Sequence, residues 1–440
     1  MRKHSILTAA LLAIATSSFA GGYLTNTNQS IYFLRYPART ASIGIDGVYY
    51  NPAGAAFYNE GFHFQFNWQN AKQHRDAVAN YNNLFMANFE NPSADGSRKF
   101  RGNVNVPIQP SLFALYNKGN WSFQAGFGFI GGGGACEFDD GVGMFEAMVG
   151  SNGLTALGDN FGGYALNSQV TGKSYYMGFT LAAARKLTDN LSVSFGLRGI
   201  YVTQNYTGSI TDVKFRAKDG TVIDQTQNPA LSDLVLDCKQ TGFGVAPIIG
   251  IDYKATDWLN LAVKYEFNTR LSVKSTEHNN AAFNQLASNN PAFAGYLDGA
   301  KTDCDMPALL SIGAQFTPTE KLRIGVGYNR YFDVATTQWD KDRLDDTNEL
   351  TFGVEYDVND RFEVSAGLQR TIYDQTDSNV SDLAFSMTSF CYGFGVGYKV
   401  TDKVKVNAAY FQTIYSDYST QTTTYSRTNR VIGVGVDIAF

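Results

Sequence analysis

The chain has 440 residues, of which 17% are charged and 14% aromatic, and its formal net charge is −5. The mean hydropathy is slightly negative. No apolar run reaches the ~18 residues of a membrane-spanning helix, which excludes a bundle of transmembrane helices. No basic tract stands out, which argues against nucleic acid as a partner. The sequence holds only four histidines, so we expect no histidine-based metal centre and no cofactor.

The first twenty residues have the features of a secretory signal peptide. Arg2 and Lys3 precede an apolar run from Ile6 to Ala15, and residues 18–20 supply small side chains at the −3 and −1 positions of a cleavage site. This run is too short to span a bilayer, which argues against a membrane anchor. We expect cleavage after residue 20, which removes two cations and changes the formal charge from −5 to −7.

From residue 61 onward, apolar side chains alternate with polar ones. Phe62, Phe64, Phe66 and Trp68 are separated by polar residues, which in a strand places an apolar face opposite a polar one. The same pattern recurs along the chain and ends with the segment 432–440. Because a soluble β-sandwich shows this alternation too, two further features are needed to choose between the folds.

The first feature is that short and long polar connections alternate strictly. The short turns are at 117–120, 187–190, 255–257, 317–320, 358–361 and 401–403. The long connections are near 71–103, 132–171, 207–240, 275–305, 332–346, 374–387 and 415–426. This spacing gives fourteen strands and is typical of outer-membrane barrels, with short periplasmic turns and long extracellular loops. An even strand count closes the sheet, as lipid requires.

The second feature is the placement of aromatic residues at both ends of the predicted strands. Trp121 and Trp258 lie next to short turns, whereas Trp68 and Tyr201 lie toward long loops, and Phe440 ends the last strand. Aromatic rings favour the two membrane interfaces. The sequence therefore predicts an all-β protein, in which residues 61–440 form a fourteen-stranded antiparallel transmembrane β-barrel in the outer membrane.

Residues 21–60 do not alternate in this way, and they contain the motif Asn51, Pro52, Ala53 and Gly54. A barrel of fourteen strands is too wide for its own side chains to fill, so we expect this segment to fold inside the lumen as a hatch. The alternative is a loose periplasmic tail. The segment is too apolar for a tail, since it contains Tyr23, Ile31, Phe33, Leu34, Ile43, Val48 and Tyr49.

The second and third strands contain residues that disrupt strand pairing. In the second strand, the residues expected to face outward are Val104, Val106, Ile108, Pro110, Leu112, Ala114 and Tyr116. The disrupting residues are Pro107, Pro110, Gly126, Gly128, Gly131, Gly132, Gly133 and Gly134. Proline cannot donate to the ladder, and consecutive glycines hold a strand poorly. We therefore predict a lateral gate here. The alternative is that these residues begin the extracellular loops.

The mature chain resembles the FadL/TodX family of outer-membrane transporters for hydrophobic compounds. The resemblance rests on Gly22 and Asn26, the Asn51-Pro52-Ala53 motif, the strand count, the terminal Ala439-Phe440, and the segments 109–138 and 191–201. It implies a hatch-plugged barrel with an internal site for an amphipathic ligand and an exit at a kinked third strand. We expect a monomer in contact with outer-membrane lipid, lipopolysaccharide and the barrel-assembly machinery.

The resemblance departs from the fatty-acid members of the family after Tyr201. Those members have basic residues there that can meet a carboxylate, whereas residues 202–205 of this chain are Val, Thr, Gln and Asn. The inward-facing charged residues are Arg198, Lys264, Glu266 and Arg323. These side chains are candidates for polar contacts with a ligand in the lumen. The alternative is that they are wall charges paired with acids, so a carboxylate ligand is left open.

Cys136, Cys238, Cys304 and Cys391 fall near the outer end of the barrel. The oxidising cell envelope allows disulfides, with three pairings for four cysteines, and free thiols are the alternative. His63 is expected to face the lumen, but no catalytic triad pattern accompanies it. We therefore expect no enzyme. Alternatives to a transporter of hydrophobic molecules are a carrier component of a protein export system and a general porin.

Overall fold

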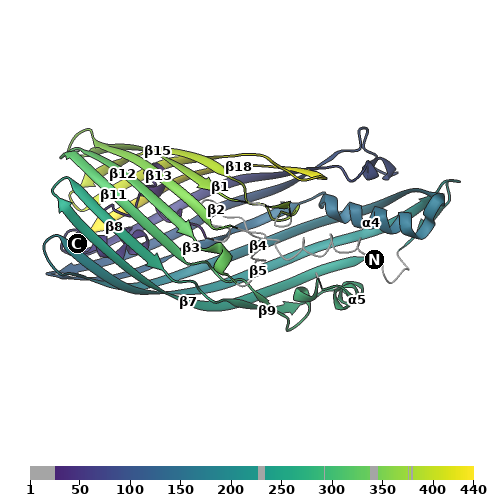
Figure 1. Ribbon diagram of the computed structural model, residues 1–440, viewed down its shortest axis with the longest axis horizontal. Helices are drawn as coiled ribbons and strands as arrows, with labels where there is room; N and C mark the ends of the chain where they lie inside the picture. The colour runs from purple at the N-terminus through teal and green to yellow at the C-terminus, as the bar shows by residue number, and fades with distance from the viewer. Residues whose placement is uncertain (1–24, 226–232, 292, 337–344, 375, 378–379) are drawn as a thin grey trace.

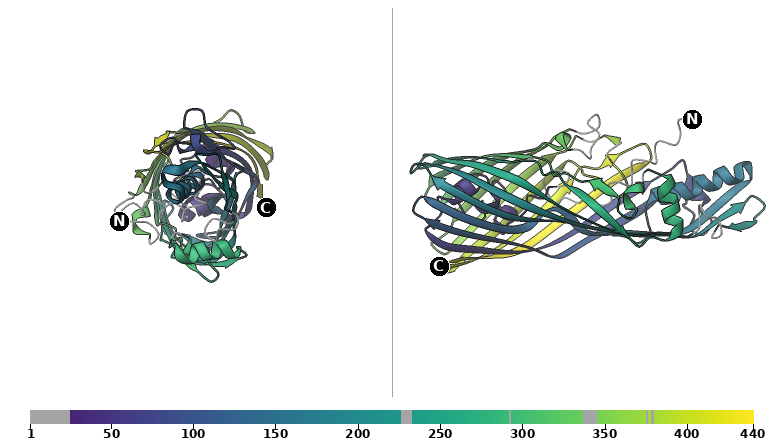
Figure 2. Two further views of the ribbon diagram at one scale, coloured as in Figure 1. Left: turned by 90° about the vertical axis from the view of Figure 1, so that its right-hand side faces the viewer. Right: turned by 90° about the horizontal axis from the view of Figure 1, so that it is seen from below.

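A computed structural model describes residues 25–225, 233–291, 293–336, 345–374, 376–377 and 380–440. The predicted signal peptide, residues 1–20, lies outside the described residues. The described chain forms an elongated cylinder of tilted strands, with α4 and α5 at one end and the C-terminus at the other (Figures 1 and 2). The predicted all-β fold, a closed fourteen-stranded antiparallel barrel with an N-terminal segment, is confirmed.

The barrel wall is one antiparallel sheet, closed because β1 pairs with β18 along its length. Its strands are β1 (Gly61–Ala79), β2 (Arg98–Lys118), β3 (Trp121–Phe138), β4 (Phe161–Lys186), β5 (Leu191–Ala217), β7 (Leu234–Thr256), β8 (Leu259–Glu266) continued by β9 (Ser272–Glu277), β10 (Lys301–Asp303) continued by β11 (Leu309–Thr319), β12 (Leu322–Tyr331), β13 (Thr347–Asp357), β14 (Phe362–Ile372), β15 (Ser389–Thr401), β16 (Val404–Tyr415) and β18 (Thr423–Ala439).

The connections hold the remaining elements. These are η1 (Leu84–Ala87), α4 (Gly143–Leu157), η2 (Gly158–Asn160), β6 (Val222–Asp224), α5 (Ala281–Asn289), η3 (Ala294–Tyr296), η4 (Asp333–Ala335) and β17 (Tyr418–Ser419). The six short turns lie where the sequence predicts them. The predicted long loops are too wide, because β1 continues to Ala79 and β2 begins at Arg98. Backbone pairing continues beyond the hydrocarbon, where outward side chains become polar and the apolar alternation ends.

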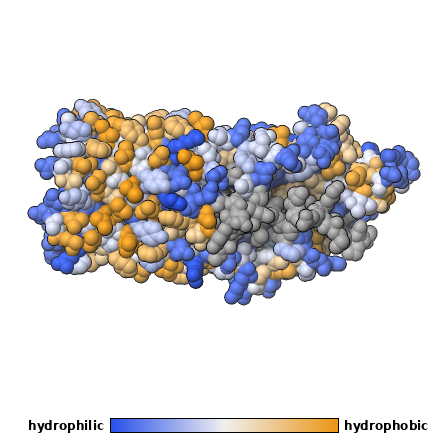
Figure 3. Space-filling model, viewed as in Figure 1, coloured by the Kyte–Doolittle hydropathy of each residue, from blue (hydrophilic) through white to orange (hydrophobic). Residues whose placement is uncertain are grey.

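The outward face of the strands carries the expected apolar belt. Phe62, Phe64 and Phe66 are 50%, 43% and 47% exposed, although they are large and apolar. Figure 3 shows an apolar region over the barrel strands, bordered by hydrophilic residues at the end with the short turns and toward the extracellular loops. Such a belt removes apolar surface from water only when the barrel is inserted in lipid. None of the helices in the described residues is long and apolar enough to cross a membrane.

One part of the predicted outward stripe on β2 is wrong. Val104 and Val106 are 3% and 7% exposed and belong to the lumen cluster, whereas Leu112 is 48% exposed on the outside. The β1–β2 register shifts between Gln69 and Ala71, opposite residues 106–109. A single unmatched residue reverses the face of every side chain that follows it. Pro107 therefore lies in a bulge that moves the two valines from the lipid side to the lumen.

Of the predicted hatch, residues 21–60, the first four, which include Gly22 and Tyr23, lie outside the described residues. Residues 25–60, hereafter the hatch, lie inside the barrel. The hatch contains three short helices, α1 (Ile31–Arg35), α2 (Gly47–Tyr50) and α3 (Pro52–Ala55). Ser30 caps α1, because its hydroxyl accepts a hydrogen bond from the backbone N–H of Phe33 at 3.1 Å. The hatch and the wall share one apolar cluster, in which Ile31, Leu34 and Val48 are fully buried. The hatch therefore fills the part of the lumen that the side chains of the wall do not reach.

Glycines on the inner face of the wall give the hatch its seat. Five of these glycines lie so close to the hatch that an added Cβ atom would be within 2.6 Å of a hatch atom. They are Gly325, Gly353, Gly367, Gly393 and Gly433. The closest approach is at Gly393, whose Cβ would meet the backbone carbonyl oxygen of Leu34 at 1.8 Å. Backbone cannot rotate away as a side chain can. The small residues on the polar face of these strands thus allow close packing of the hatch.

We predict that Gly393→Ala loosens the hatch while the barrel still forms. Overpacking of this kind costs about 1–3 kcal/mol, and the cost falls on the contact with Leu34. Hydrogen exchange in residues 31–36 should accelerate, whereas exchange in the wall strands should not change. Gly119→Ala is the control for glycine loss, because no atom lies within 4 Å of a Cβ placed there, although its φ of +58° adds some strain. Unchanged protection of α1 in Gly393→Ala would contradict this role.

Candidate functional site: a plugged lumen with an interrupted wall

The ladder between β2 and β3 is interrupted. Val104 pairs with Cys136, and Leu112 pairs with Phe127, but residues 105–111 of β2 have no partner in β3. Residues on both sides of this stretch are in register with β3, so the break is confined within the wall. In hydrocarbon, backbone groups without partners cost several kcal/mol each. This wall gap therefore needs donors and acceptors from elsewhere in the protein.

The predicted gate residues meet at this gap. Pro107 and Pro110 lie in the part of β2 that has no partner in β3, which is where proline, unable to donate to a ladder, is tolerated. In β3, Gly132 and Gly134 have φ values of +77° and +76°, and the β3–β4 register shifts between Phe129 and Gly131 and again between Gly132 and Gly134. Glycine adopts this left-handed conformation without steric cost. This part of β3 thus contains two bulges that interrupt regular pairing.

The remaining gate candidates have different neighbours. Gly126 still pairs with Phe113, outside the gap, and a Cβ on it would lie 3.0 Å from a methyl group of Val48 in the hatch. Gly128 lies at the edge of the gap, and a Cβ on it would lie 2.2 Å from the side-chain oxygen of Gln29. These two glycines therefore make room for the hatch.

The start of the hatch closes the gap from inside. The backbone N–H of Asn26 donates to the carbonyl of Ile130 at 2.7 Å, and the amide of Gln29 donates to the carbonyl of Phe129 at 2.7 Å. The amide of Asn26 also donates to Phe129, at 3.2 Å. A cavity of about 20 Å³ remains between Asn26, Val106 and the glycine run, which is room for about one water molecule. In this conformation the gap is closed.

An apolar pocket of about 40 Å³ lies at the extracellular end. α4 contributes Phe145 and Met148, and α5 contributes Phe283 and Leu286. The wall residues of the pocket are Val170, Gly208, Ser209, Ile210, Leu234 and Leu236, and Phe293 completes the lining. The residues Val170, Leu236, Phe283 and Phe293 also belong to the apolar cluster of the lumen. Apolar surface is therefore continuous from the extracellular loops into the barrel.

The segment Ser381–Met387, which connects β14 and β15, folds into the barrel mouth. Leu383, Phe385 and Met387 are at most 2% exposed. Arg75 of β1 donates to the carbonyls of Leu383 at 3.3 Å and Phe385 at 3.4 Å. Sequence reasoning missed this segment, which it treated as a polar loop; the apolar pattern Leu-Ala-Phe-Ser-Met was the available signal.

The carboxylate of Asp382 ties the same segment to its surroundings. It accepts hydrogen bonds from the backbone N–H of Met144 at 2.8 Å and from the hydroxyl of Tyr425 at 3.0 Å. Burial raises the pKa of this loop carboxyl above its ordinary value, and the two hydrogen bonds oppose that shift. Since Met144 lies in the first turn of α4, the loop that covers the mouth and the helix that lines the pocket are joined.

Three of the four charged lumen candidates form one cluster against the hatch. Arg198 donates to both carboxylate oxygens of Glu266 at 2.7 and 2.8 Å, and to Thr180 at 2.9 Å. Its guanidinium also lies 4.5 Å from the centre of the Tyr49 ring. Lys264 donates to the backbone carbonyl of Tyr49 at 3.3 Å and lies 3.5 Å from Glu266. Arg198 and Lys264 are thus both paired with Glu266, and both contact Tyr49 of α2.

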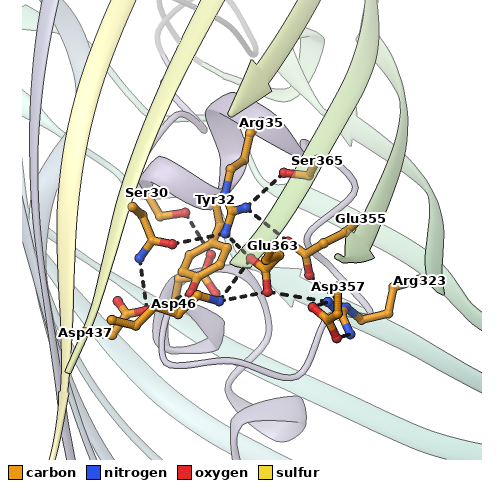
Figure 4. Close-up of polar contacts among 12 residues, drawn as sticks. Ser30, Tyr32, Arg35, Asp46, Arg323, Glu355, Asp357, Glu363, Ser365 and Asp437 are labelled. Atoms are coloured by element: carbon orange, nitrogen blue, oxygen red, sulfur yellow. Dashed lines mark hydrogen bonds and ion pairs between the residues drawn. The ribbon is translucent and has the colours of Figure 1, made fainter. Parts of the chain in front are cut away.

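Arg323, the fourth candidate, lies in a second charged cluster at the periplasmic end of the hatch, shown in Figure 4. It donates to Asp357 at 2.7 and 2.8 Å and to Glu355 at 2.8 Å. Arg35 of α1 is fully buried beside it, pairs with Glu363 and lies 3.6 Å from Glu355. The four sequence candidates are thus divided between two sites, and both sites anchor the hatch.

Tyr32 and Lys405 extend this cluster to neighbouring strands. Lys405 donates to Glu363 at 2.8 and 3.0 Å. The Tyr32 hydroxyl donates to Asp437 at 2.6 Å. Burial, together with the neighbouring carboxylates, raises the pKa of Tyr32 well above its ordinary value, so the hydroxyl remains a donor. A polar cavity of about 460 Å³, lined in part by Tyr32, Arg323 and Lys405, opens beside these groups at the periplasmic end.

The predicted hatch motif binds the wall opposite this cluster. Asn51 caps α3 and donates to the side chain of Asp252 at 3.2 Å, and the amide of Gln124 donates to the carbonyl of Pro52 at 2.8 Å. The carbonyl of Ala53 accepts a hydrogen bond from Ser192. A Cβ on Gly54 would lie 2.8 Å from a carboxylate oxygen of Asp252. Each residue of the motif therefore serves to seat α3 against β3, β5 and β7.

The remaining candidates from the sequence are the four cysteines and His63. Cys136, Cys238, Cys304 and Cys391 are all buried free thiols, so the structure contains none of the three disulfide pairings that the sequence allows. His63 faces the lumen at 3% exposure and contacts the backbone carbonyls of Asn59 and Glu60 at 3.0 and 3.1 Å.

Residues 154–438, well over half of the chain, match the family described as outer membrane protein transport protein (OMPP1/FadL/TodX). The chain belongs to this family. The family and the barrel together place this FadL/TodX member in the outer membrane. Membership also supports transport of hydrophobic compounds as the general function and fits a chain that is not an enzyme. No match was found among curated protein sequences.

Solved structures share this fold at low sequence identity. A Pseudomonas aeruginosa FadL homologue aligns with a TM-score of 0.67 at 13% identity, over 96% of this chain and 100% of its own. The Pseudomonas putida toluene transporter TodX aligns at 0.62 and 13%, over 97% and 100%. The Ralstonia pickettii toluene transporter TbuX aligns at 0.58 and 17%, over 94% and 98%. At these identities the likeness establishes the fold.

We predict that Arg35→Met releases the hatch from its periplasmic anchor. The substitution leaves Glu363 and Glu355 buried without the Arg35 cation, and breaking a buried pair in this way costs about 3–5 kcal/mol. Hydrogen exchange in residues 31–50 should accelerate strongly. Arg330→Met is the matched control, because its pair with Asp346 is 2.9 Å long but its side chain is 46% exposed. Equal effects of the two substitutions would show that the buried cluster does not anchor the hatch.

Proposed function

We propose that this FadL/TodX member imports hydrophobic or amphipathic small molecules, such as long-chain fatty acids or aromatic hydrocarbons. The molecule is captured at the extracellular loops, passes into the plugged lumen and leaves sideways through the wall between β2 and β3. The observation that carries the proposal is the break in the β2–β3 ladder, which hatch residues Asn26 and Gln29 close from inside.

Capture is assigned to the apolar pocket between α4 and α5. Its lining is almost entirely apolar, so transfer of an apolar molecule from water into it is favourable at about 25 cal/mol per Å² of surface buried. The lining residues Phe283 and Phe293 also face the lumen cluster. A captured molecule can therefore move inward without returning to water.

The charged cluster at the periplasmic end favours a sideways exit over passage to the periplasm. Below the hatch, the cavity is lined by charged side chains that include Glu363, Arg323 and Lys405. An apolar molecule there would displace water from charged groups, which is costly. At the wall gap the same molecule meets glycine, Val106 and lipid. Moving the Asn26–Gln29 segment by a few ångströms opens that route without breaking either charged cluster. The filled lumen also supports a plugged transporter over a general porin.

A disulfide across the gap tests lateral release. A Cβ on Gly134 would lie 3.8 Å from the Cβ of Val106, which is the usual separation in a disulfide. We predict that oxidised Val106→Cys/Gly134→Cys, in a background with the native cysteines replaced by serine, loses uptake of radiolabelled oleate and toluene in cells lacking other transporters. Dithiothreitol should restore uptake.

The matched control is a disulfide between the same strands outside the gap. Here Cys136 is retained and only the other three native cysteines are replaced by serine, so that Val104→Cys can form a disulfide with Cys136, its partner in the intact ladder. This disulfide should leave uptake unchanged. If the fully oxidised gap variant transports at the rate of its reduced form, release does not occur between β2 and β3. If neither form, nor the unmodified protein, takes up any hydrophobic probe, the transport proposal itself fails.

Capture is tested by a polar substitution in the pocket. We predict that Leu286→Gln lowers the initial uptake rate about three- to tenfold at low substrate concentration, because lost apolar contact weakens capture. The rate at saturating substrate should remain close to that of the unmodified protein. Leu154→Gln is the control, since Leu154 lies on α4 but is 53% exposed and outside the pocket. Equal rates in the two variants would remove the pocket from the pathway.

A further inference from the structure

Two cations stand directly opposite each other on the lipid-facing side of the wall. Lys72 of β1 and Arg430 of β18 are paired residues in the antiparallel ladder. Both are exposed, and each follows the outward-facing parity of its strand. Facing residues of an antiparallel pair have Cα atoms about 4.5–5.5 Å apart. Like charges at this separation destabilise the pair unless an anion lies between them.

The described part of the chain supplies no such anion. Neither Lys72 nor Arg430 forms an ion pair with a described residue. The acid closest in sequence on that face is Asp76, which is occupied by Lys99 at 2.6 Å and Arg101 at 2.7 Å. The outer neighbours in the ladder are Asn105, beside Lys72, and Gln412, beside Arg430. Both neighbours are uncharged, so the local charge is positive.

The height of the pair places it at the membrane surface. The outward rows below it are Trp68 opposite Val434 and then Asn70 opposite Ile432. Trp68 is the uppermost aromatic of the apolar stripe on β1, and tryptophan favours the interface. Each row of the same face adds about 7 Å. Lys72 and Arg430 therefore lie just above the hydrocarbon, in the leaflet on the side of the long loops, which is the outer leaflet.

The pair also borders the wall gap. Lys72 is opposite Asn105, the first residue of β2 that has no partner in β3. On the other side of the gap, Lys173 of β4 is opposite Ala135 and is exposed on the outside. A molecule bound by these cations stands beside the place where the ladder is open. The apolar stripe below, with Phe66 and Trp68, can take its acyl chains.

We propose that Lys72 and Arg430 bind a phosphate group of a phosphorylated glycolipid in the outer leaflet, beside the wall gap. A phosphate monoester carries close to two negative charges and three acceptor oxygens, so one group can bridge the two cations with charge-assisted hydrogen bonds. The acyl chains of the glycolipid lie along the apolar stripe of β1 and β18. The site is independent of the transported molecule, and it requires only the outer-membrane barrel.

The test is a binding measurement on the purified full chain in a non-ionic detergent. Native mass spectrometry with a diphosphorylated glucosamine-disaccharide lipid should show a bound lipid that Lys72→Gln/Arg430→Gln weakens about tenfold or more, since each cation contributes about one factor of five. The dephosphorylated lipid, with the same acyl chains, should bind the unmodified protein as weakly as the diphosphorylated lipid binds the variant.

The matched control is Lys321→Gln/Arg361→Gln, which removes two exposed cations from the short periplasmic turns. This control should bind the diphosphorylated lipid like the unmodified protein. Heat-modifiable migration in electrophoresis checks that each barrel is folded, and Lys72→Arg/Arg430→Lys, which keeps both charges, should restore binding. Equal binding by the unmodified protein and by the charge-removed variant would overturn the proposal, as would equal binding of the two lipids.

Discussion

Every backbone hydrogen-bonding group of this chain that meets hydrocarbon needs a partner within the protein. The closed fourteen-stranded sheet satisfies this constraint around the barrel, with β1 and β18 joined along their length. The ladder is interrupted between β2 and β3. There the hatch supplies the missing donors to Ile130 and Phe129. The same bonds therefore complete the wall and hold the first residues of the hatch in place.

The hatch is fixed by two different kinds of contact. Along β12–β18, inner-face glycines let its backbone approach the wall closely. At two places, buried charges hold it: Arg35 with Glu363 on the periplasmic side, and Arg198 with Glu266 against Tyr49. Separating such buried pairs is costly, because each charge would be left desolvated without its partner. The contacts of Asn26 and Gln29 at the gap are neutral hydrogen bonds, which are individually weaker. The proposed lateral release therefore requires only the weaker of these contacts to break.

Transport driven by apolar transfer needs a continuous route and a barrier to the wrong exit. The pocket between α4 and α5 joins the apolar cluster of the lumen, and the inward-folded segment around Phe385 narrows the mouth. The periplasmic side is lined by charges. On the proposed route, a molecule that prefers hydrocarbon to water meets falling free energy toward the wall and rising free energy toward the periplasm.

The sequence alone determined the barrel, its strand number and its short turns, because lipid on one face and lumen on the other impose a period of two on every strand. It also located the break at Pro107, Pro110 and the glycine run, since those residues oppose pairing by themselves. Only the tertiary structure decided what lies across from each residue. The bulge beside Asn70 turned Val104 and Val106 inward. Arg198 pairs with Glu266, 68 residues away on a strand that is not its ladder neighbour. Alternation gives the face of a side chain, whereas its partner depends on register and on the path of the hatch.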